Sequence, residues 1–343
     1  MAERLADHTT LRLGGPATRF VTACTEDELV AAVRAADEAG EPLLVLGGGS
    51  NLVVADEGFP GTVVRVATRG ISPDVEGDDA VSCGGVIVTV AAGESWDDLV
   101  ARAVSSGWVG VEALSGIPGS VGATPIQNVG AYGQEVAQTI ASVRVWDRTL
   151  RGVRTFANAD CGFGYRHSRF KADPQRHVVL SVAFQFRQGS LGAPVEYAEL
   201  ARALGVERGV RVPLRDVRDT VLRLRAGKGM VLDADDHDSW SAGSFFTNPF
   251  VDPAALPDGA PAWPQPDGTV KTSAAWLIEH AGFAKGHGTG PVGLSTKHTL
   301  ALTNRGHART ADLLALAREV RDGVEARFGI RLVNEPVLVG CEL

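Results

Sequence analysis

Two glycine-rich segments are the places where the backbone of this chain could do chemistry. Residues 47–51 read Gly-Gly-Gly-Ser-Asn and directly follow an apolar run at residues 43–46 that is typical of a buried strand. Successive small residues let backbone N–H groups approach a pyrophosphate closely and form an anion-binding nest. Taken alone, the same segment is equally typical of a simple glycine turn between two strands.

The second segment, residues 115–133, reads Ser-Gly-Ile-Pro-Gly-Ser-Val-Gly-Ala-Thr-Pro-Ile-Gln-Asn-Val-Gly-Ala-Tyr-Gly. So many glycines and prolines exclude a regular element, and they predict a long shaped loop with several exposed backbone N–H groups. Two such loops in one chain could hold the two ends of a long anionic cofactor.

Several familiar nucleotide-binding and nucleophile motifs are absent. The chain has no G-x-x-x-x-G-K-[ST] loop, and its run Gly286-His-Gly288-Thr-Gly290 breaks the G-x-G-x-x-G pattern. It also has no G-x-S-x-G elbow, because Pro118 stands where the first glycine would precede Ser120. A bound dinucleotide would therefore not use a Rossmann fingerprint.

The acidic run Asp-Ala-Asp-Asp-His-Asp at residues 233–238 carries carboxylates of the kind that bind metal ions. An EF-hand loop would also need glycine at its sixth position and glutamate at its twelfth, where this chain has Asp238 and Ser244. A solvated acidic surface is therefore the favoured interpretation, and we expect no metal site.

The elements that must position the two loops alternate between helix and strand patterns, which predicts a mixed α+β protein. Thr25 and Glu28 form a capping box before one helix, and Thr272 and Thr310 are expected N-caps of two later helices. A surface linker is expected at residues 69–79. The expected strands lie at residues 43–46, 52–54, 62–66, 86–92, 140–146, 178–186, 298–303 and 331–339.

Composition excludes several classes of protein. The 33 basic and 41 acidic residues give a net charge of −8, and binding of nucleic acid needs a basic face. The longest apolar runs fall short of the roughly 18–20 residues that cross a bilayer, and the first residues lack a signal-peptide pattern. We therefore expect a cytoplasmic protein that binds neither nucleic acid nor membrane. We also expect a monomer, although neither charge nor apolar pattern determines the oligomeric state. Wide spacing predicts reduced core thiols for the four cysteines, which are Cys24, Cys83, Cys161 and Cys341.

The two loops, GGGSN and GIPGSVGATPIQNVGAYGQE, together resemble the flavin-binding signature of the UDP-N-acetylenolpyruvoylglucosamine reductase (MurB) family. Further similar blocks follow in the family's order along nearly the whole chain. They are HTTLRLGG at residues 8–15, CGFGYRHS at 161–168, AGSFFTNP at 242–249, KTSAAWLI at 271–278 and NEP at 334–336.

This resemblance implies an α+β architecture with the FAD-binding fold of the p-cresol methylhydroxylase/vanillyl-alcohol oxidase group and a third, substrate-binding lobe. Residues 1–70 and 71–229 would be two FAD-binding subdomains, the second with an inserted loop. Residues 230–330 would form the substrate-binding domain. Residues 331–343 would be a C-terminal strand that carries a catalytic glutamate.

The resemblance also implies a reaction. NADPH would reduce non-covalently bound FAD, and flavin N5 would then give hydride to the vinyl C3 of UDP-N-acetylglucosamine enolpyruvate. A proton would go to C2, and the product would be UDP-N-acetylmuramate, a precursor of peptidoglycan.

Arg166, Ser244 and Glu335 match the family's catalytic positions, and their chemistry suits this reaction. Hydride addition builds negative charge on C2 and on the adjacent carboxylate. An arginine binds a carboxylate in bidentate fashion and stays charged, and a buried carboxylic acid can polarise the developing enolate. A serine hydroxyl can deliver the proton, because the carbanion is a far stronger base than an alkoxide.

Contacts to the ligands are implied in the same way. The tyrosine at position 197 resembles the one that closes over the UDP end in the longer, loop-bearing type of the family, and residues 188–227 leave room for that loop. The residues expected to contact the substrate or nicotinamide cofactor are Tyr165, Tyr197, Lys228, Asn248 and Lys271. The residues expected to contact FAD are Gly47, Gly48, Gly49, Ser50, Asn51, Ser115, Gly116, Pro118, Gly119, Gly122, Ala123, Gln127, Asn128, Gly130, Ala131 and Tyr132.

Two other functions stay open from the sequence. An oxidase of sugars or alcohols on the same fold often binds its flavin covalently through a histidine or cysteine in the first loop, and residues 47–51 contain neither. A non-catalytic protein that binds flavin or a nucleotide sugar would not require Arg166, Ser244 and Glu335 together.

Overall fold

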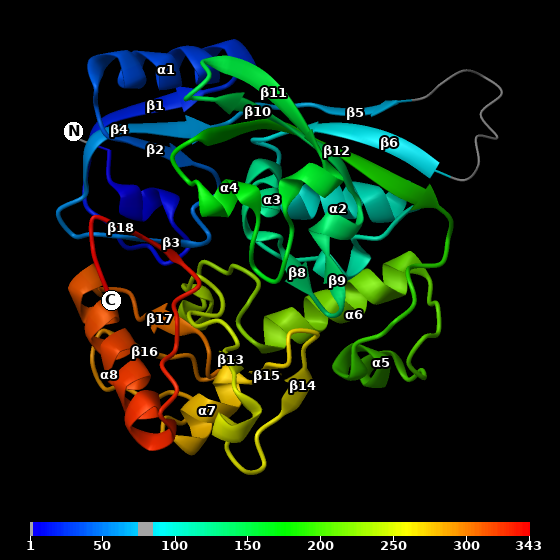
Figure 1. Cartoon of the computed structure of the whole chain (residues 1–343), viewed down its shortest axis with the longest axis vertical. Helices are drawn as coiled ribbons and strands as arrows, with labels where there is room; N and C mark the ends of the chain where they lie inside the picture. The colour runs from blue at the N-terminus through cyan, green and yellow to red at the C-terminus, as the bar shows by residue number, and fades with distance from the viewer. Residues whose placement is uncertain (1–2, 75–84) are drawn as a thin grey trace. The chain divides into compact units, whose positions relative to one another are not determined.

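The computed structural model describes residues 3–74 and 85–343 and shows a mixture of helices and strands (Figure 1), as expected. The chain forms two compact units. The first unit comprises Met1–Thr18, Gly49–Pro60 and Gly227–Leu343, and the second comprises Arg19–Gly48 and Gly61–Ala226. The finer division into two FAD subdomains, a substrate domain and a C-terminal strand stays a prediction.

Two sheets form most of the framework of the second unit. One has the strand order β1-β4-β2, with β2 and β4 parallel. The other is antiparallel with the order β11-β10-β12-β6-β5, and β7 also pairs with β12. The strands are β1 (Ala17–Ala23), β2 (Leu43–Leu46), β4 (Phe59–Val66), β5 (Ile71–Asp74), β6 (Gly85–Ala91), β7 (Trp108–Val109), β8 (Gly130–Ala131), β9 (Gln134–Glu135), β10 (Ile140–Asp147), β11 (Gly152–Ala157) and β12 (His177–Gln188).

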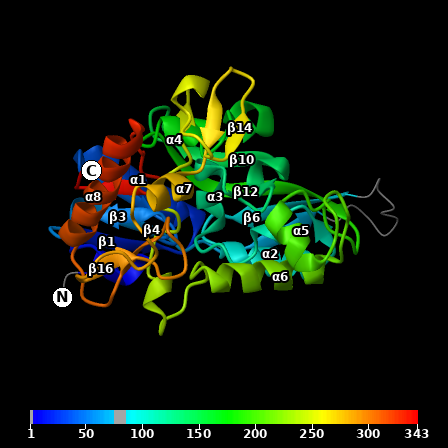
Figure 2. The same ribbon diagram turned by 90° about the horizontal axis from the view of Figure 1, so that it is seen from below.

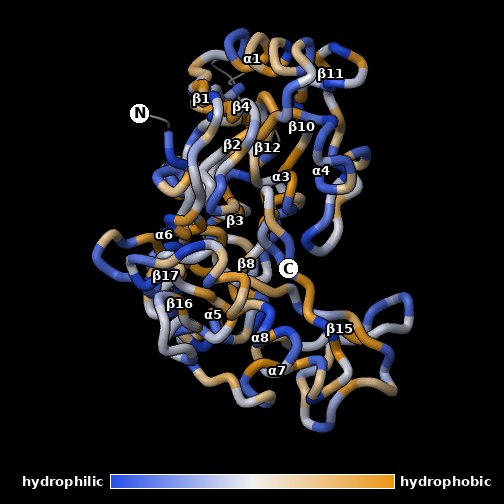
Figure 3. Tube along the Cα trace, turned by 90° about the vertical axis from the view of Figure 1, so that its left-hand side faces the viewer, coloured by the Kyte–Doolittle hydropathy of each residue, from blue (hydrophilic) through white to orange (hydrophobic). Residues whose placement is uncertain are grey.

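Local signals determine helix α1 (Glu26–Ala39). The Thr25 hydroxyl accepts from the Glu28 N–H, the Glu28 carboxylate accepts from the Thr25 N–H, and Gly40 ends the helix in the left-handed conformation. Its trace alternates between hydrophobic and hydrophilic positions (Figure 3), and its apolar residues Leu29 and Val33 are fully buried. The other helices of this unit are α2 (Trp96–Ser105), α3 (Thr124–Gln127), α4 (Arg169–Ala172), α5 (Ala198–Leu204) and α6 (Leu214–Gly227).

The turn between β10 and β11 depends on the fully buried carboxylate of Asp147. Its Oδ1 accepts hydrogen bonds from the N–H groups of Thr149 at 3.1 Å and Leu150 at 3.0 Å. The guanidinium of Arg176 approaches Oδ2 to 3.0 Å. Burial opposes ionisation, but the bonds from Arg176 and the turn outweigh it and hold the pKa of Asp147 below its ordinary value.

We expect Asp147→Ala to lower the free energy of unfolding by about 1–3 kcal/mol, because the N–H groups of the turn and the Arg176 guanidinium lose their charged acceptor. A carboxyl with a lowered folded pKa stabilises fully above its ordinary pKa of about 4 and loses this contribution as pH falls through the folded pKa. Denaturant unfolding at pH 7 and below pH 4 should therefore show that the difference in free energy of unfolding between the wild type and the variant becomes smaller in acid. A gap that widens in acid would contradict the assignment.

The first unit contains a small antiparallel sheet of order β13-β15-β14, the hairpin β16-β17 and a parallel pair of β3 with β18. Helix α8 carries seven buried residues along one face. The strands are β3 (Leu52–Val54), β13 (Phe250–Val251), β14 (Ala262–Pro264), β15 (Val270–Thr272), β16 (Val292–Leu294), β17 (Leu302–Asn304) and β18 (Val337–Val339). The α-helices are α7 (Ala274–His280) and α8 (Thr310–Phe328).

Two expected helix caps are wrong by one residue. Thr272 is the last residue of β15, and the side chain of Ser273 caps α7 instead. Arg309 is the N-cap of α8, while the Thr310 hydroxyl donates to the carbonyl of Val54 at 2.6 Å. Capping depends on which side-chain oxygen meets the first helical N–H groups, and β-sheet pairing or tertiary bonds can take one candidate away.

Other boundaries also differ from the expectation. Residues 71–74 of the supposed linker form β5, while residues 75–79 lie outside the described part of the chain. Of the last expected strand, residues 337–339 form β18 and pair with β3, while Asn334 makes an isolated antiparallel bridge with Phe246. Cys24 is exposed rather than in the core, Cys161 is buried, and Cys83 is not described. Across residues 3–74 and 85–343, none of the helices has the length and apolar character of a bilayer span.

Candidate active site

Gly47 and Gly48, at the start of the first glycine-rich loop, pack against the second loop within the second unit. A β-carbon added to Gly48 would lie 2.6 Å from the Cα of Gly119, and one added to Gly47 would lie 2.5 Å from the Oγ of Ser120. Real β-carbons do not come so close to other atoms, so only glycine permits this approach. The structure therefore brings together two loops that are far apart in the sequence.

The second loop is held in an unusual backbone conformation. Asn128 and Tyr132 have φ values of 43° and 49°, which cost non-glycine residues strain of order 1–3 kcal/mol each. The Asn128 side chain compensates by donating to the carbonyl of Gly164 at 2.9 Å and to the Glu135 carboxylate at 3.1 Å. The side-chain hydrogen bonds of Asn128 thus stabilise the conformation of the second loop. The loop is not wholly irregular, since it contains the single helical turn α3.

Several loop N–H groups that we expected to be exposed are used by the protein. The Gly116 N–H donates to the Asp97 carboxylate at 2.6 Å, and the Gly122 N–H donates to the carbonyl of Ala92 at 2.8 Å. The Ala123 N–H bonds within the loop. These three N–H groups therefore already have acceptors within the protein, and contact of their residues with FAD stays a prediction.

Arg166 is fastened to the second loop. Its Nη2 donates to the carbonyl of Gly130 at 2.8 Å, and its own carbonyl accepts from Lys171 Nζ at 3.0 Å. The neighbouring Ser168 hydroxyl donates to the carbonyl of Ile126 at 2.7 Å. With a φ of 50°, Arg166 also has a left-handed backbone, and such strain clusters at functional sites.

Ser244 directly precedes a short backbone ladder of the first unit that joins residues 245–247 to residues 333–335. The Glu335 N–H donates at 2.8 Å to the carbonyl of Phe245, the residue after Ser244. The side chain of Asn51, from the first glycine loop, donates to the Glu335 carbonyl at 3.4 Å, and the carbonyl of Asn51 accepts from the Val337 N–H. These bonds place Asn51 beside the glutamate segment.

Three tyrosines of the second unit are among the expected contact residues, and two of them, Tyr132 and Tyr165, lie near cationic side chains. The rings of Tyr132 and Tyr197 meet edge to face at 5.6 Å, and the Arg166 guanidinium lies 5.5 Å from the ring of Tyr165. Burial raises the pKa of Tyr132 to about 12 and lowers the pKa of Arg225 to about 10. At neutral pH the Tyr132 hydroxyl is therefore protonated while Arg225 keeps its charge.

The remaining expected contact residues lie in the first unit. Asn248 accepts a hydrogen bond from the Ala274 N–H at 3.0 Å, so its amide oxygen helps to start α7. Lys271 lies opposite Trp263 in the β14–β15 pair, and its Nζ is 5.9 Å from that ring. Sequence reasoning missed Trp263, whose only signal was an apolar ring beside prolines. Lys228 is half-buried.

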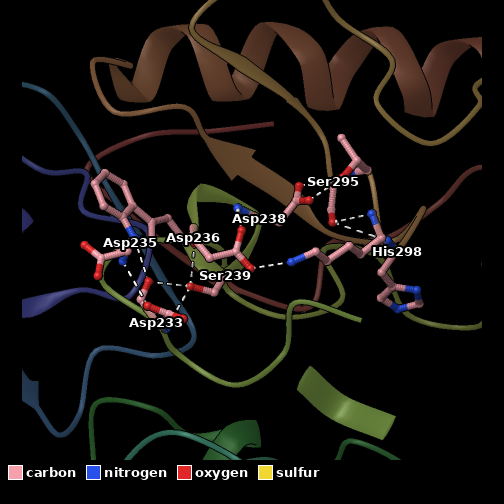
Figure 4. A network of polar contacts seen from close by, with 10 residues as sticks. Asp233, Asp235, Asp236, Asp238, Ser239, Ser295 and His298 are labelled. Atoms are coloured by element: carbon pink, nitrogen blue, oxygen red, sulfur yellow. Dashed lines mark hydrogen bonds and ion pairs between the residues drawn. The ribbon is translucent and has the colours of Figure 1, made fainter. Parts of the chain in front are cut away.

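The acidic run braces a neighbouring turn of its own unit (Figure 4). Asp236 pairs with Lys297 at 2.5 Å, and Asp238 accepts hydrogen bonds from both the N–H and the hydroxyl of Thr296. The hydrogen bond from Lys297 holds the pKa of Asp236 below its ordinary value. Within the described ranges, no three histidine, cysteine or acidic side chains are grouped to hold a metal ion.

The broken glycine pattern at residues 286–290 wraps around a cation of the chain itself. The Arg305 guanidinium donates to the carbonyl of Gly288 at 2.6 Å and to that of Gly286 at 3.1 Å. A β-carbon at Gly293 would collide with the same guanidinium. This loop therefore presents carbonyl oxygens to an arginine instead of N–H groups to a phosphate.

Comparison with known proteins agrees with the glycine-loop geometry. Residues 17–152 match the model of the FAD binding domain family, and this stretch contains both loops. Loops that exclude β-carbons fit a cofactor with a pyrophosphate, and residues 47–51 offer no histidine or cysteine for covalent attachment. The chain is therefore an FAD-dependent oxidoreductase.

Similar proteins define the family of the chain more narrowly. Residues 235–339 match the model of the C-terminal domain of UDP-N-acetylenolpyruvoylglucosamine reductase. Enzymes of that name from Cutibacterium acnes and Streptomyces avermitilis are 61% and 59% identical, over 99% of this chain and 90% and 94% of theirs. The chain belongs to the UDP-N-acetylenolpyruvoylglucosamine reductase family, whose members act in the synthesis of peptidoglycan precursors.

A solved structure supports the fold. The crystal structure of the UDP-N-acetylenolpyruvylglucosamine reductase from Thermus caldophilus is 28% identical, superposes with a TM-score of 0.66 and covers 99% of both chains. The expected α+β architecture with an FAD-binding fold is thereby confirmed.

Proposed function

We propose that this chain reduces UDP-N-acetylglucosamine enolpyruvate to UDP-N-acetylmuramate with NADPH as co-substrate and non-covalent FAD. The observation that carries the proposal is its identity of 61% to a reductase of that name over 99% of the chain. The two glycine-rich loops would hold FAD, and the bound flavin would supply hydride chemistry between NADPH and the vinyl C3 of the substrate.

Arg166 binds the carboxylate of the enolpyruvyl group. A guanidinium matches the two oxygens of a carboxylate and cannot lose its proton at neutral pH. The bond from Nη2 to the Gly130 carbonyl and the cation–π contact with Tyr165 fix the direction of the guanidinium before substrate arrives. Preorganised positive charge is most useful where negative charge develops in the transition state.

Glu335 and Ser244 act at the carbon next to that carboxylate. Glu335, as a carboxylic acid, polarises the enolate that forms when C3 receives hydride. The hydroxyl of Ser244 gives its proton to C2. The ladder between Phe245 and Glu335 supports this division of labour, because one hydrogen bond of 2.8 Å ties the two backbone segments together.

The other contacts are assigned by chemistry. Lys228 and Lys271 offer ammonium groups to a diphosphate, and Tyr165, Tyr197 and Asn248 offer hydrogen-bonding tips. Tyr197 suits contact with the UDP moiety, because its ring rests on Tyr132 while 46% of its surface stays exposed. The FAD contacts are those of the two glycine loops, apart from the three N–H groups already used by the protein. We also propose that the protein works as a cytoplasmic monomer and binds neither nucleic acid nor membrane.

The product identifies the reaction. Anaerobic incubation with the enolpyruvyl nucleotide sugar and NADPH should consume both in equal amounts and give a product heavier by two hydrogen atoms. Mass spectrometry and NADPH absorbance measure this directly. NADPH oxidation that continues without the enolpyruvyl substrate, or a nucleotide sugar of unchanged mass, would refute the proposed function. Either result would favour an oxidase or a binding protein.

A further inference from the structure

The first turn of α2 makes three hydrogen bonds to the segment that contains the second glycine loop. The Trp96 N–H donates to the Gly119 carbonyl at 3.0 Å, and its indole Nε1 donates to the Leu114 carbonyl at 3.1 Å. The next residue, Asp97, accepts from the Gly116 N–H at 2.6 Å. Trp96 is fully buried and anchors this turn in the core. The start of α2 therefore sets the path of the loop backbone.

The Asp97 carboxylate has a second partner on helix α6. Arg218 binds it in bidentate fashion, with Nη1 2.7 Å from Oδ1 and Nη2 2.9 Å from Oδ2. Only 15% of the Arg218 side chain is exposed, and its bond to Asp97 joins α6 to α2, which is labelled above α6 in Figure 2. Such paired, charge-assisted bonds fix both position and orientation. Burial opposes ionisation of Asp97, but the bonds from Arg218 and Gly116 outweigh it and keep its pKa lowered.

The peptide at Gly116 can rotate between two orientations unless a hydrogen bond fixes it. Its φ of 72° lies in the left-handed region, and glycine populates both hands readily. A fixed acceptor for its N–H selects one orientation of this peptide and therefore of the loop that follows. Asp97 lies within the stretch that matches the FAD binding domain, whereas Arg218 lies beyond it, in the inserted segment at residues 188–227.

We propose that Asp97 and Arg218 are positioning residues for FAD: Asp97 fixes the Gly116 peptide of the second glycine loop, and Arg218 fixes Asp97. The proposal rests on the assignment of that loop to the cofactor. It gives the inserted segment a second task besides carrying Tyr197. A loop that is ordered before the cofactor arrives loses less conformational entropy on binding and holds the cofactor more tightly.

The test is the dissociation constant of FAD, measured from the fluorescence of released flavin in the full-length protein. Asp97→Ala should raise it by at least about tenfold, the effect of losing a hydrogen bond to a charged group. Arg218→Met should raise it by about threefold or more, since the carboxylate keeps Gly116 but loses its own orientation. Two exposed residues nearby in the sequence provide matched controls, Asp98 for Asp97 and Arg215 for Arg218. The Asp98→Asn and Arg215→Met variants should leave the dissociation constant of FAD unchanged.

A double-mutant cycle decides whether the two residues act in series. If Arg218 works only through Asp97, the double variant should bind FAD like Asp97→Ala alone. Additive effects would overturn the series arrangement. Melting temperatures without FAD separate positioning from bulk stability, and a drop in melting temperature with unchanged FAD affinity in both single variants would overturn the proposal. The cycle needs neither NADPH nor substrate, so an enzyme that binds FAD but fails to reduce the substrate refutes only the proposed function.

Discussion

Ser244→Ala is expected to slow the oxidation of reduced flavin by the enolpyruvyl substrate by roughly 10²–10⁴-fold, the usual contribution of a positioned proton donor. Alanine keeps the backbone ladder to Glu335 but has no proton for C2. Reduction of the flavin by NADPH involves no proton transfer to C2 and should stay at the wild-type rate. Anaerobic stopped-flow absorbance follows the two half-reactions separately.

A control variant lies on the same ladder. Thr247 lies three residues after Ser244, and its hydroxyl donates to the carbonyl of Val333 at 3.3 Å. The Thr247→Val variant removes this hydroxyl. It should leave both half-reactions near the wild-type rates. Equal losses in both half-reactions of Ser244→Ala would show that the residue supports the structure or the flavin, and the proton-donor role would then be wrong.

Arg166→Lys is expected to lower kcat/KM for the enolpyruvyl substrate by roughly 10²–10³-fold, comparable to the loss of an oxyanion donor. Lysine keeps the charge but cannot bind a carboxylate in bidentate fashion or repeat the contact with the Gly130 carbonyl. Steady-state kinetics with varied substrate measure the effect, and FAD content serves as a check on the loop.

The exposed neighbour of this arginine supplies the comparison. The exposed Arg169 guanidinium lies 4.4 Å from the centre of the Phe156 ring and is not among the proposed substrate contacts, so Arg169→Lys should change kcat/KM little. An Arg166→Lys enzyme with the same kcat/KM as Arg169→Lys would contradict the assigned carboxylate contact. A loss confined to FAD binding would assign Arg166 to the cofactor loop instead.

Local signals were enough for the elements that depend on neighbouring residues. The capping box of Thr25 and Glu28 starts α1, and Gly40 ends it, because both effects act within one turn. The two glycine loops were also recognisable, since close backbone approach requires glycine whatever the partner. The error at Thr272 arose because pairing in β15 placed that residue in a sheet, and a cap pattern in sequence does not contain the pairing partner.

The parts of the site that depend on distant pairs could not be predicted from pattern alone. The ladder between Phe245 and Glu335 and the bond between Asp97 and Gly116 join segments whose contact is set by tertiary packing. Asp97 gave no signal beyond an acid near the start of a helix, where the helix dipole already favours one. The acidic run at residues 233–238 gave no signal of its bonds to residues 296 and 297, because those bonds also depend on tertiary packing.

The most direct test of the central claim is an anaerobic absorbance titration of the purified protein, first with NADPH and then with the enolpyruvyl substrate. We predict a yellow protein that bleaches with NADPH and regains its flavin absorbance when the substrate is added without oxygen. Absorbance that returns only with oxygen would contradict the reductase assignment and indicate an oxidase-like relative. A colourless protein that takes up no added FAD would contradict the flavoenzyme assignment itself.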